Sequence, residues 1–461
     1  MDQIIPNFNS MRLFLFFFVF FTTLSGYTQP SEIVSGPMIG HTELRSGKIW
    51  VQFAEGIKDV QLFFSEKGKS TRTMARAILN VNPYFNIVHY ELNDLQPGTA
   101  YDYELKIMGK ALASGSLKTQ ELWQWRKPAP DFSFIAGSCS YFNEAGFDRP
   151  GRAYGGDSTI FVTMSKEPAS FMLWLGDNWY TREVDYYSSW GLHQRAATDR
   201  KLSILQPLWA SMPHYAIWDD HDFGWNDADK SYPFKESSRA AFNSFWLNPS
   251  SGIDDKGIFT KFTWNDVDVF MLDDRWFRSN DDMKDSINGQ PNPEKEMFGK
   301  TQMDWLKNAL LQSKSNGNIN FRIIATGSQI LNPRSPFDCF RRFPVEYADF
   351  MKFLQENKIN GVIFMTGDRH HSEIIKVDRP GTYSLYDITS SPLTSGTHVF
   401  GGEEKDNPYR VVGVDKLQNY SRVSFSGKGP ERTMKVEFLG VKGELLGEWS
   451  IRKDQLSSRI K

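Results

Sequence analysis

A chain of 461 residues is long enough for two or three domains with sizeable cores. Its 36 Phe and 14 Trp exclude a disordered protein, because such aromatic content belongs to packed cores. A formal net charge of −2 gives no indication of a polyanion-binding surface, so we expect no nucleic acid as a structural partner.

The N-terminus carries a short apolar run. Residues 13–21 are nine consecutive apolar residues that directly follow Met11 and Arg12. A positive start, a short apolar run and a following stretch of small and polar residues predict a secretory signal peptide over residues 1–29. The run is too short to span a bilayer, and we expect no transmembrane segment elsewhere. The sequence therefore predicts an exported protein, periplasmic or extracellular.

The chain contains two cysteines, Cys139 and Cys339, which are too few for a disulfide scaffold. They could pair with each other or remain as two buried thiols. The residues around Cys139, described below, favour a metal ligand instead.

Residues 31–125 predict an all-β domain. Alternating or β-branched and aromatic segments, separated by Gly and Asn, predict strands at residues 48–53, 60–65, 87–92 and 101–107. Tyr101 follows a Pro-Gly turn, as at the corner of an immunoglobulin- or fibronectin-like sandwich, where a tyrosine bonds back to the preceding loop. Pro128 and Pro130 then predict a linker.

A second domain is expected over residues 131–455. Short continuous apolar runs, each followed by a polar cluster, predict strands buried on both faces at residues 132–136, 171–175, 214–218, 267–272, 321–325, 361–365 and 382–388. Amphipathic segments predict intervening helices at residues 236–247, 302–313 and 345–357, which makes the fold α/β and layered. Segments 432–438 and 445–451 predict a terminal hairpin on the sheet edge.

The cluster after residues 214–218 has an unusual composition. Residues 217–227 have no Lys or Glu and contain Asp219, Asp220, His221, Asp222, Asn226 and Asp227. By itself this stretch could be an acidic turn whose Asp side chains cap backbone N–H groups. Ligand-bearing loops of α/β domains, however, gather at the carboxyl ends of strands, so the polar clusters are expected to meet.

The side chains expected to meet include a thiol, a phenol, carboxylates and imidazoles: Cys139, Asp177, Tyr180, Asp219, Asp220, His221, Asn226, Asp227, Asp368, His370 and His371. Carboxylates crowded together repel one another unless cations neutralise them. A thiolate and a phenolate suit iron, whereas Asp and Asn oxygens suit calcium, magnesium or manganese. The cluster therefore predicts a site for different metals and not a single structural zinc.

Paired metals serve in-line displacement at phosphorus, where they activate water and stabilise the attacking and leaving oxygens. His221 lies beside Asp220, which would point at a metal. That position suits a group that donates a hydrogen bond to the developing charge or a proton to the leaving alkoxide.

Five motifs resemble, in order and spacing, those of the alkaline phosphatase D (PhoD-like) family of the metallophosphoesterase class. They are Gly137-Ser138-Cys139, Leu175-Gly176-Asp177-Asn178-Trp179-Tyr180, Ile217-Trp218-Asp219-Asp220-His221-Asp222, Met271-Leu272-Asp273-Asp274-Arg275 and Gly367-Asp368-Arg369-His370-His371. The resemblance runs from about residue 31 to the C-terminus. It implies a metallophosphoesterase-type β-sheet sandwich flanked by helices, preceded by a small all-β immunoglobulin- or fibronectin-like domain.

The resemblance also implies an activity. The family hydrolyses phosphate mono- and diesters with iron and calcium in the site, and other divalent metals remain open. The expected reaction is attack of a metal-activated water or hydroxide on a small-molecule or polymer phosphate ester. Carried over by position, the metal ligands are Cys139, Asp177 (bridging), Tyr180, Asp220, Asn226, Asp368 and His370, and the catalytic residue is His221.

Several roles are open at this point. Arg275 either contacts phosphate or forms an ion pair with a nearby Asp, and His371 either binds a metal or supports a ligand. Asp219, Asp222 and Asp227 either support the site or serve as turn residues. Four arginines flank the motifs and could meet an anionic substrate or lie in solvated loops: Arg149, Arg152, Arg182 and Arg195. Three tryptophans could wall a pocket or pack in the core: Trp179, Trp225 and Trp276.

Two alternatives compete with the exported phosphatase or phosphodiesterase. One is a nuclease- or phospholipase-type phosphodiesterase on the same scaffold, because the metal set suits all of these reactions. The other is a catalytically inactive surface binding protein, which the complete ligand set disfavours. The sequence leaves the natural substrate and the oligomeric state open.

Overall fold

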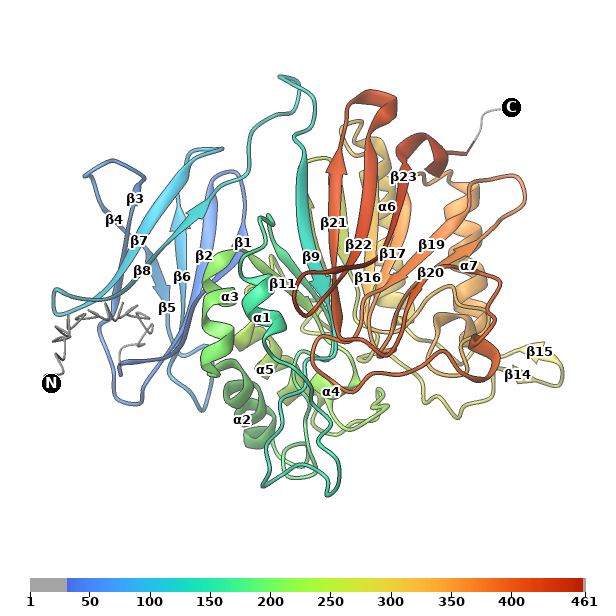
Figure 1. Cartoon of the computed structure of the whole chain (residues 1–461), viewed down its shortest axis with the longest axis horizontal. Coiled ribbons are helices and arrows are strands. Elements are labelled where there is room, and N and C mark those ends of the chain that lie inside the picture. The colour runs from blue at the N-terminus through green and yellow to red at the C-terminus, as the bar shows by residue number, and fades with distance from the viewer. Residues whose placement is uncertain (1–30, 459–461) are drawn as a thin grey trace, which may run out of the picture.

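The computed structural model describes residues 31–458 (Figure 1). The predicted signal peptide, residues 1–29, lies outside the described residues. Within residues 31–458, no helix combines the length and the apolar character that crossing a membrane requires.

The N-terminal part is all-β. Its strands form two four-stranded sheets, with the orders β1-β2-β6-β5 and β4-β3-β7-β8. The strands are β1 (Ile33–Thr42), β2 (Ser46–Phe53), β3 (Gln61–Glu66), β4 (Thr73–Met74), β5 (Arg76–Ile78), β6 (Ile87–Asn93), β7 (Ala100–Ile107) and β8 (Lys110–Lys118). The four strands predicted here match β2, β3, β6 and β7. The two sheets enclose a core of their own that includes Leu62, Tyr90 and Leu105.

The predicted tyrosine corner is confirmed. The backbone N–H of Gln96 donates to the hydroxyl of Tyr101 at 2.7 Å, which ties the turn to the strand that follows it. The boundary of this domain near residue 125 stays a prediction.

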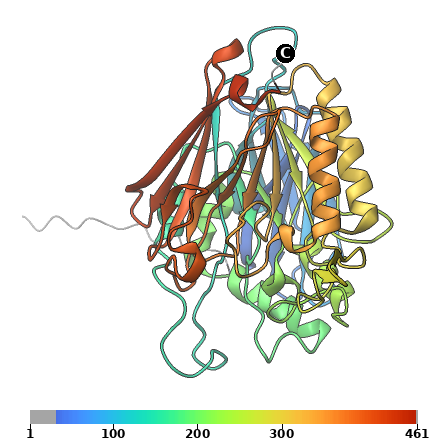
Figure 2. The ribbon, with the colours of Figure 1, turned by 90° about the vertical axis from the view of Figure 1, so that its right-hand side faces the viewer.

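The remainder of the chain forms two large sheets. One has six strands in the order β11-β10-β9-β21-β22-β23, and the other has seven in the order β12-β13-β16-β17-β19-β18-β20. Figure 2 shows them as two layers, with α6 and α7 on the outer side of the seven-stranded sheet. The strands are β9 (Phe132–Gly137), β10 (Met172–Leu175), β11 (His214–Ile217), β12 (Thr260–Trp264), β13 (Val267–Met271), β16 (Phe321–Thr326), β17 (Val362–Thr366), β18 (Ser372–Val377), β19 (Leu385–Thr389), β20 (Arg410–Val414), β21 (Asn419–Ser426), β22 (Thr433–Gly440) and β23 (Leu445–Arg452), with a separate small hairpin of β14 (Ser286–Ile287) and β15 (Gln290–Pro291).

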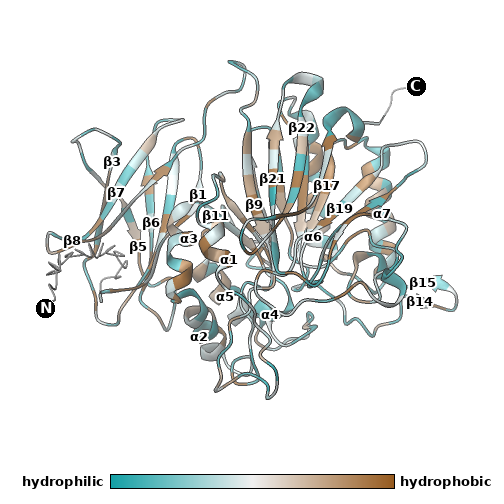
Figure 3. Cartoon of the chain, viewed as in Figure 1, coloured by the Kyte–Doolittle hydropathy of each residue, from teal (hydrophilic) through white to brown (hydrophobic). Residues whose placement is uncertain are grey.

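The continuous apolar runs are strands buried on both faces, as predicted. Every residue of β10 and of β13 is buried, and Figure 3 shows hydrophobic colouring along the central strands. Strands β9, β10 and β11 run parallel to one another, and so do β13, β16, β17 and β19. Parallel strands covered on both sides need such unbroken apolar sequences.

The helices are α1 (Ile160–Met164), α2 (Ser189–Arg200), α3 (Gln206–Ser211), α4 (Asp220–Phe223), α5 (Lys235–Phe245), α6 (Gly299–Ser315) and α7 (Pro344–Glu356). The three predicted helices match α5, α6 and α7. Helix α5 ends two residues earlier than predicted, because Trp246 already has extended backbone angles (φ −118°, ψ 140°). Helix α7 begins at Pro344, whose missing N–H costs nothing at a helix start.

The predicted terminal hairpin is confirmed, since β22 and β23 pair antiparallel and β23 is the edge of its sheet. Strand β12 was not predicted. Its residues alternate between buried and half-buried and pair only with β13 at an edge, so they lack the continuous apolar signature of the central strands.

Two glycines allow close approach at the carboxyl ends of the strands, Gly367 between the two sheets and Gly176 between neighbouring turns of the six-stranded sheet. A Cβ on Gly367, after β17, would lie 2.4 Å from the carbonyl oxygen of Leu175, at the end of β10. Gly176 has φ +92°, and a Cβ there would lie 2.7 Å from Cβ of Asp219. Only glycine fits such contacts without displacing backbone.

Candidate metal centre

The predicted site residues follow the strands at a constant interval. Cys139, Asp177, Asp219 and Asp368 each lie two residues beyond the end of their strand, which is β9, β10, β11 and β17 respectively. Because these strands are parallel within their sheets, their carboxyl ends lie along one edge. Loops from both sheets meet there.

The turns that carry these residues have left-handed backbone. The φ angles are 61° at Cys139, 52° at Asp177, 64° at Asp368 and 56° at His370. This region is costly for residues other than glycine and persists only where the surrounding structure imposes it. Four of the seven predicted ligands are therefore held in strained turns.

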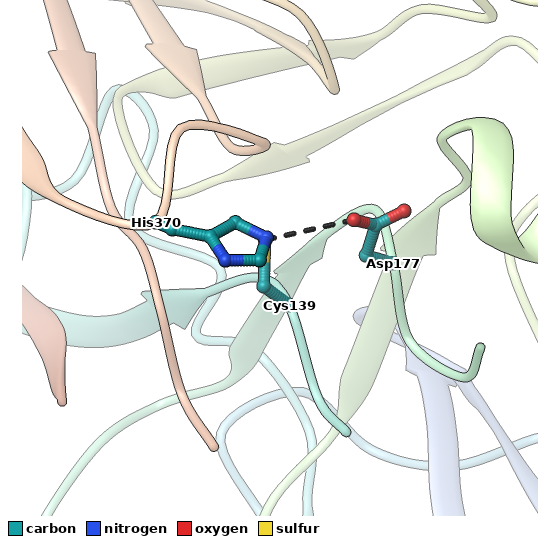
Figure 4. Close-up of side chains that lie close together, drawn as sticks. All are labelled: Cys139, Asp177 and His370. Atoms are coloured by element: carbon teal, nitrogen blue, oxygen red, sulfur yellow. Dashed lines mark hydrogen bonds between the residues drawn. The ribbon is translucent and has the colours of Figure 1, made fainter. Parts of the chain in front are cut away.

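Figure 4 shows Cys139, Asp177 and His370 converging from three different loops. One potential ligand atom from each lies within 4.8 Å of the other two. The Cys139 Sγ is 3.6 Å from Asp177 Oδ2. The Tyr180 hydroxyl donates to the same Oδ2 at 3.0 Å and lies 3.3 Å from His370 Nε2. A thiol, a phenol, an imidazole and a carboxylate thus surround one point.

A second group shares Asp177. Its ligand atoms, with those of Asp220 and His221, also lie within 4.8 Å of one another. The backbone N–H of His221 approaches Asp177 Oδ1 at 3.3 Å, and that of Asp227 donates to Asp220 Oδ2 at 2.7 Å. Asp177 is therefore the carboxylate that could bridge two ions.

In the protein alone, burial disfavours the anionic forms of three of the predicted ligands. Burial, then the nearby Asp220 carboxylate, raises the pKa of Asp177 well above its usual range. Burial also raises the pKa of the Cys139 thiol to about 11, and burial and Asp177 together raise the pKa of Tyr180. Each pKa is raised because the ionised form of the group would be shielded from water and would have no cation beside it. Metal ions would stabilise the anionic forms, and the sulfur, nitrogen and oxygen donors fit them.

Two of the undecided aspartates serve the turn. Asp222 accepts from the backbone N–H of Asp219 at 3.0 Å and from that of Asn178 at 2.9 Å, which fixes the start of α4. Asp219 is fully buried and accepts from Arg275 Nε at 2.6 Å. Arg275 also pairs with Asp338 at 3.1 Å. The structural ion pair thus accounts for Arg275.

Asn226 and Asp227 lie at the mouth of the site. Both are exposed, and the Asn226 amide donates to Asp227 Oδ2 at 2.6 Å. Asn226 lines a cavity of about 790 Å³ together with His221 and Tyr180. Its role as a ligand stays a prediction.

His371 belongs to a separate buried group with Glu373 and Glu404. Its Nε2 lies 3.5 Å from Glu373 Oε1. Arg410 donates to Glu373 at 2.6 Å, and Arg369 donates to both oxygens of Glu404. Two carboxylates face two guanidinium groups, so this group is neutral without a metal. It holds the loop that carries His370.

Three residues beside the metal centre were missed. Ser391 Oγ donates to Cys139 Sγ at 3.1 Å and accepts from the backbone N–H of His370 at 2.9 Å. Tyr154 OH lies 3.0 Å from His370 Nδ1, and the ring of His398 stacks on that of His370 at 4.6 Å. Ser391 could have been found, because it follows a predicted strand in a polar cluster. Tyr154 and His398 lie in loops without a recognisable pattern.

The arginines flanking the motifs divide into two pairs. Arg182 and Arg195 are buried, and they pair with Asp148 at 2.9 Å and with Asp185 at 2.7 Å. Both are therefore held in buried ion pairs and do not lie in solvated loops, although Arg182 also lines the cavity that contains His221. Arg149 and Arg152 are exposed and line the cavity that contains His221.

The tryptophans and the cysteines are also placed. Trp179 and Trp276 are buried, whereas Trp225 lines the cavity beside His221. Cys139 and Cys339 are both buried free thiols. The two cysteines therefore form no disulfide bond with each other in this structure.

Comparison of this chain with known protein families identifies one matching family. The family model described as PhoD-like phosphatase matches residues 134–430, which confirms the resemblance in the motifs. The chain is 25% identical over 324 residues to alkaline phosphatase D of Bacillus subtilis (strain 168), an alignment covering 62% of this chain and 53% of the relative. The chain thus spans about half the length of that curated relative.

Two solved structures share the fold. A structure of PhoD has a TM-score of 0.73 at 19% identity, covering 94% of this chain and 92% of that one. Purple acid phosphatase PPD1 from yellow lupin (Lupinus luteus) seeds has a TM-score of 0.66 at 11% identity, covering 91% and 75%. These likenesses confirm the predicted fold class, a layered α/β sheet sandwich preceded by an all-β part.

Proposed function

Because the chain belongs to the PhoD-like phosphatase family, we propose that it is a metal-dependent phosphoric ester hydrolase acting on phosphate mono- or diesters. The observation that carries the proposal is the position of Asp177, which lies within 4.8 Å of two sets of potential ligands. A carboxylate shared in this way is what a two-metal phosphoesterase site requires.

The donor chemistry supports a division of the proposed ligands between two ions. Iron would be held by the thiolate of Cys139 and the phenolate of Tyr180, with His370 and Asp368. Calcium would be held by oxygens from Asp220 and Asn226. Asp177 would contact both. When bound, the ions would supply an activated water and neutralise charge on the phosphate oxygens.

His221 is the proposed acid–base residue. It lines the cavity of about 790 Å³, and the Tyr180 ring packs against it with centroids 4.2 Å apart, which fixes its orientation. Burial lowers the pKa of His221, so the neutral imidazole predominates near neutral pH. The neutral imidazole can donate a hydrogen bond to an ester oxygen, and its minor imidazolium form can give the leaving alkoxide its proton.

Export is part of the proposal. It rests on the apolar run at residues 13–21 with Met11 and Arg12 before it. Expression of the full chain with fractionation of the cells tests it. Recovery of the uncleaved protein in the cytoplasm would contradict export.

The experiment for the activity combines metal analysis with turnover. Purified protein is analysed for iron and calcium, and its hydrolysis of an aryl phosphate monoester and the matching diester is measured. We expect both metals and hydrolysis of at least one ester, both lost on chelation and restored by adding metal. Absence of both metals together with absence of hydrolysis would contradict the proposal. The ratio of the two rates separates phosphatase from diesterase.

A further inference from the structure

A loop between β9 and α1 separates two cavities. It projects at the lower edge of Figure 1, where the carboxyl ends of the strands lie. The first cavity, about 790 Å³, contains His221, Tyr180 and Asn226. The second, about 610 Å³, is lined from the other side by residues 395–398 and 416–418. Arg152, Ala153 and Tyr154 line both cavities, so the loop is their common wall.

The second cavity is lined by residues that contact His370 of the metal centre. Four of its lining residues contact that imidazole, among them Ser395, whose Oγ lies 3.3 Å from His370 Nδ1. The Gly396 carbonyl oxygen and the Tyr154 hydroxyl lie 2.7 Å and 3.0 Å from His370 Nδ1. The His398 ring stacks on the His370 ring. A molecule that enters the first cavity to react therefore has this second space next to it.

The second cavity presents cations without partners. Arg152 and Lys416 are exposed, and among residues 31–458 neither side chain has an ion pair or hydrogen bond. The one carboxylate that lines this cavity, Glu444, accepts from the backbone N–H of Lys442 at 2.9 Å. Exposed cations on both sides of a concave site attract anions and raise their local concentration.

We propose that the second cavity binds a second anionic group of the substrate, with Arg152 and Lys416 as its contacts. The inference rests on the proposed function, which places the reacting phosphate in the first cavity. The substrate class is then a phosphate ester that carries a further phosphate-type group. A guanidinium group suits this, because it can donate two parallel hydrogen bonds to one phosphate.

The test measures binding and not turnover. Metal-loaded protein is titrated calorimetrically with alkanediyl bisphosphonates of increasing chain length and with alkyl monophosphonates of matched length. At the length that spans the two cavities, we expect the bisphosphonate to bind about five- to tenfold more tightly than the monophosphonate. In the R152A and K416A variants this advantage shrinks, and in the double variant it disappears.

The control is R76A, which removes an exposed arginine from β5 in the N-terminal sheets. It should leave the advantage unchanged. Any chelation of metal by the bisphosphonate affects all variants equally. The second subsite is overturned if the bisphosphonate binds no more tightly than the monophosphonate at any chain length. It is also overturned if the tighter binding survives in the double variant. Failure of even the monophosphonates to bind would instead count against the proposed function.

Discussion

Asp177 contacts both groups of potential ligands in the metal centre. Its Oδ2 lies 3.6 Å from Cys139 Sγ and accepts from Tyr180, and its Oδ1 faces the backbone N–H of His221. Its backbone has φ 52°, a left-handed conformation that the turn after β10 imposes. The backbone conformation therefore directs the Asp177 side chain into the site, and contacts with both groups of potential ligands hold it there.

D177N should lose metals and activity together, because the amide keeps the shape of the carboxylate but removes the charge that both ions need. We expect metal content to fall and turnover to drop by about 10²-fold or more. D102N, at an exposed position of β7, is the matched control and should behave like wild type. Full activity with both metals present in D177N would refute the bridging role.

The H221A variant tests whether His221 is an acid–base residue or a metal ligand. If His221 transfers a proton, the variant should retain its metals while turnover slows by roughly 10²–10⁴-fold. Metal analysis and turnover are measured on the same preparation. Because His221 lies within 4.8 Å of Asp177 and Asp220, loss of a metal ion would reassign it as a ligand.

At the scale of elements, helix α2 carries a buried group of charges. Arg195 pairs with Asp185 at 2.7 Å, with Glu144 at 2.7 Å and with Asp199 at 3.5 Å. One guanidinium group cannot neutralise three carboxylates. Burial accordingly raises the pKa of Asp199 to about 7 against the attraction of Arg195.

This pKa predicts a pH dependence of stability. In the unfolded chain Asp199 has a pKa of about 3.9, so between about pH 4 and pH 7 the folded state binds one more proton. The contribution of Asp199 to the free energy of unfolding therefore falls as pH rises through this window, by up to about 1.4 kcal/mol per pH unit. D199N should remove that slope, measured as urea midpoints at pH values across the window. Identical slopes in wild type and variant would contradict the prediction.

At the scale of the whole molecule, the N-terminal sheets are packed onto the rest of the chain. Trp50 on β2 is fully buried against Phe245 of α5, with ring centroids 5.9 Å apart, and its Nε1 donates to the Ser244 carbonyl at 2.9 Å. The guanidinium group of Arg200 lies 4.7 Å from the Trp50 ring and 4.3 Å from that of Trp246. These contacts join the two parts through a common core.

W50A should lower the free energy of unfolding by about 3–5 kcal/mol, because it leaves a large cavity in that shared core. Trp125 offers a matched control, since 88% of its surface is exposed, and W125A should change stability by less than about 0.5 kcal/mol. Thermal unfolding of both variants is the measurement. Equal midpoints would show that the contact between the two parts contributes little.

The sequence by itself determined which polar clusters follow a buried strand. Buried parallel strands need continuous apolar runs, and residues 171–175 and 267–272 could be recognised for that reason. The same argument placed Cys139, Asp177, Asp220 and Asp368 at strand ends, and the motifs around them gave the family. The metal identities and the role of Asn226 stay predictions.

Only the tertiary structure decided which of these groups meet. The sequence leaves Asp219 and Asp222 open between support of the site and turn residues, and in the structure one pairs with Arg275 and the other fixes a turn. Tyr154 and His398 lie in loops without a recognisable pattern but contact His370. The physical reason is that these contacts join loops from two stacked sheets. Local sequence sets where each strand ends, whereas the packing of one sheet on the other sets which loop faces which.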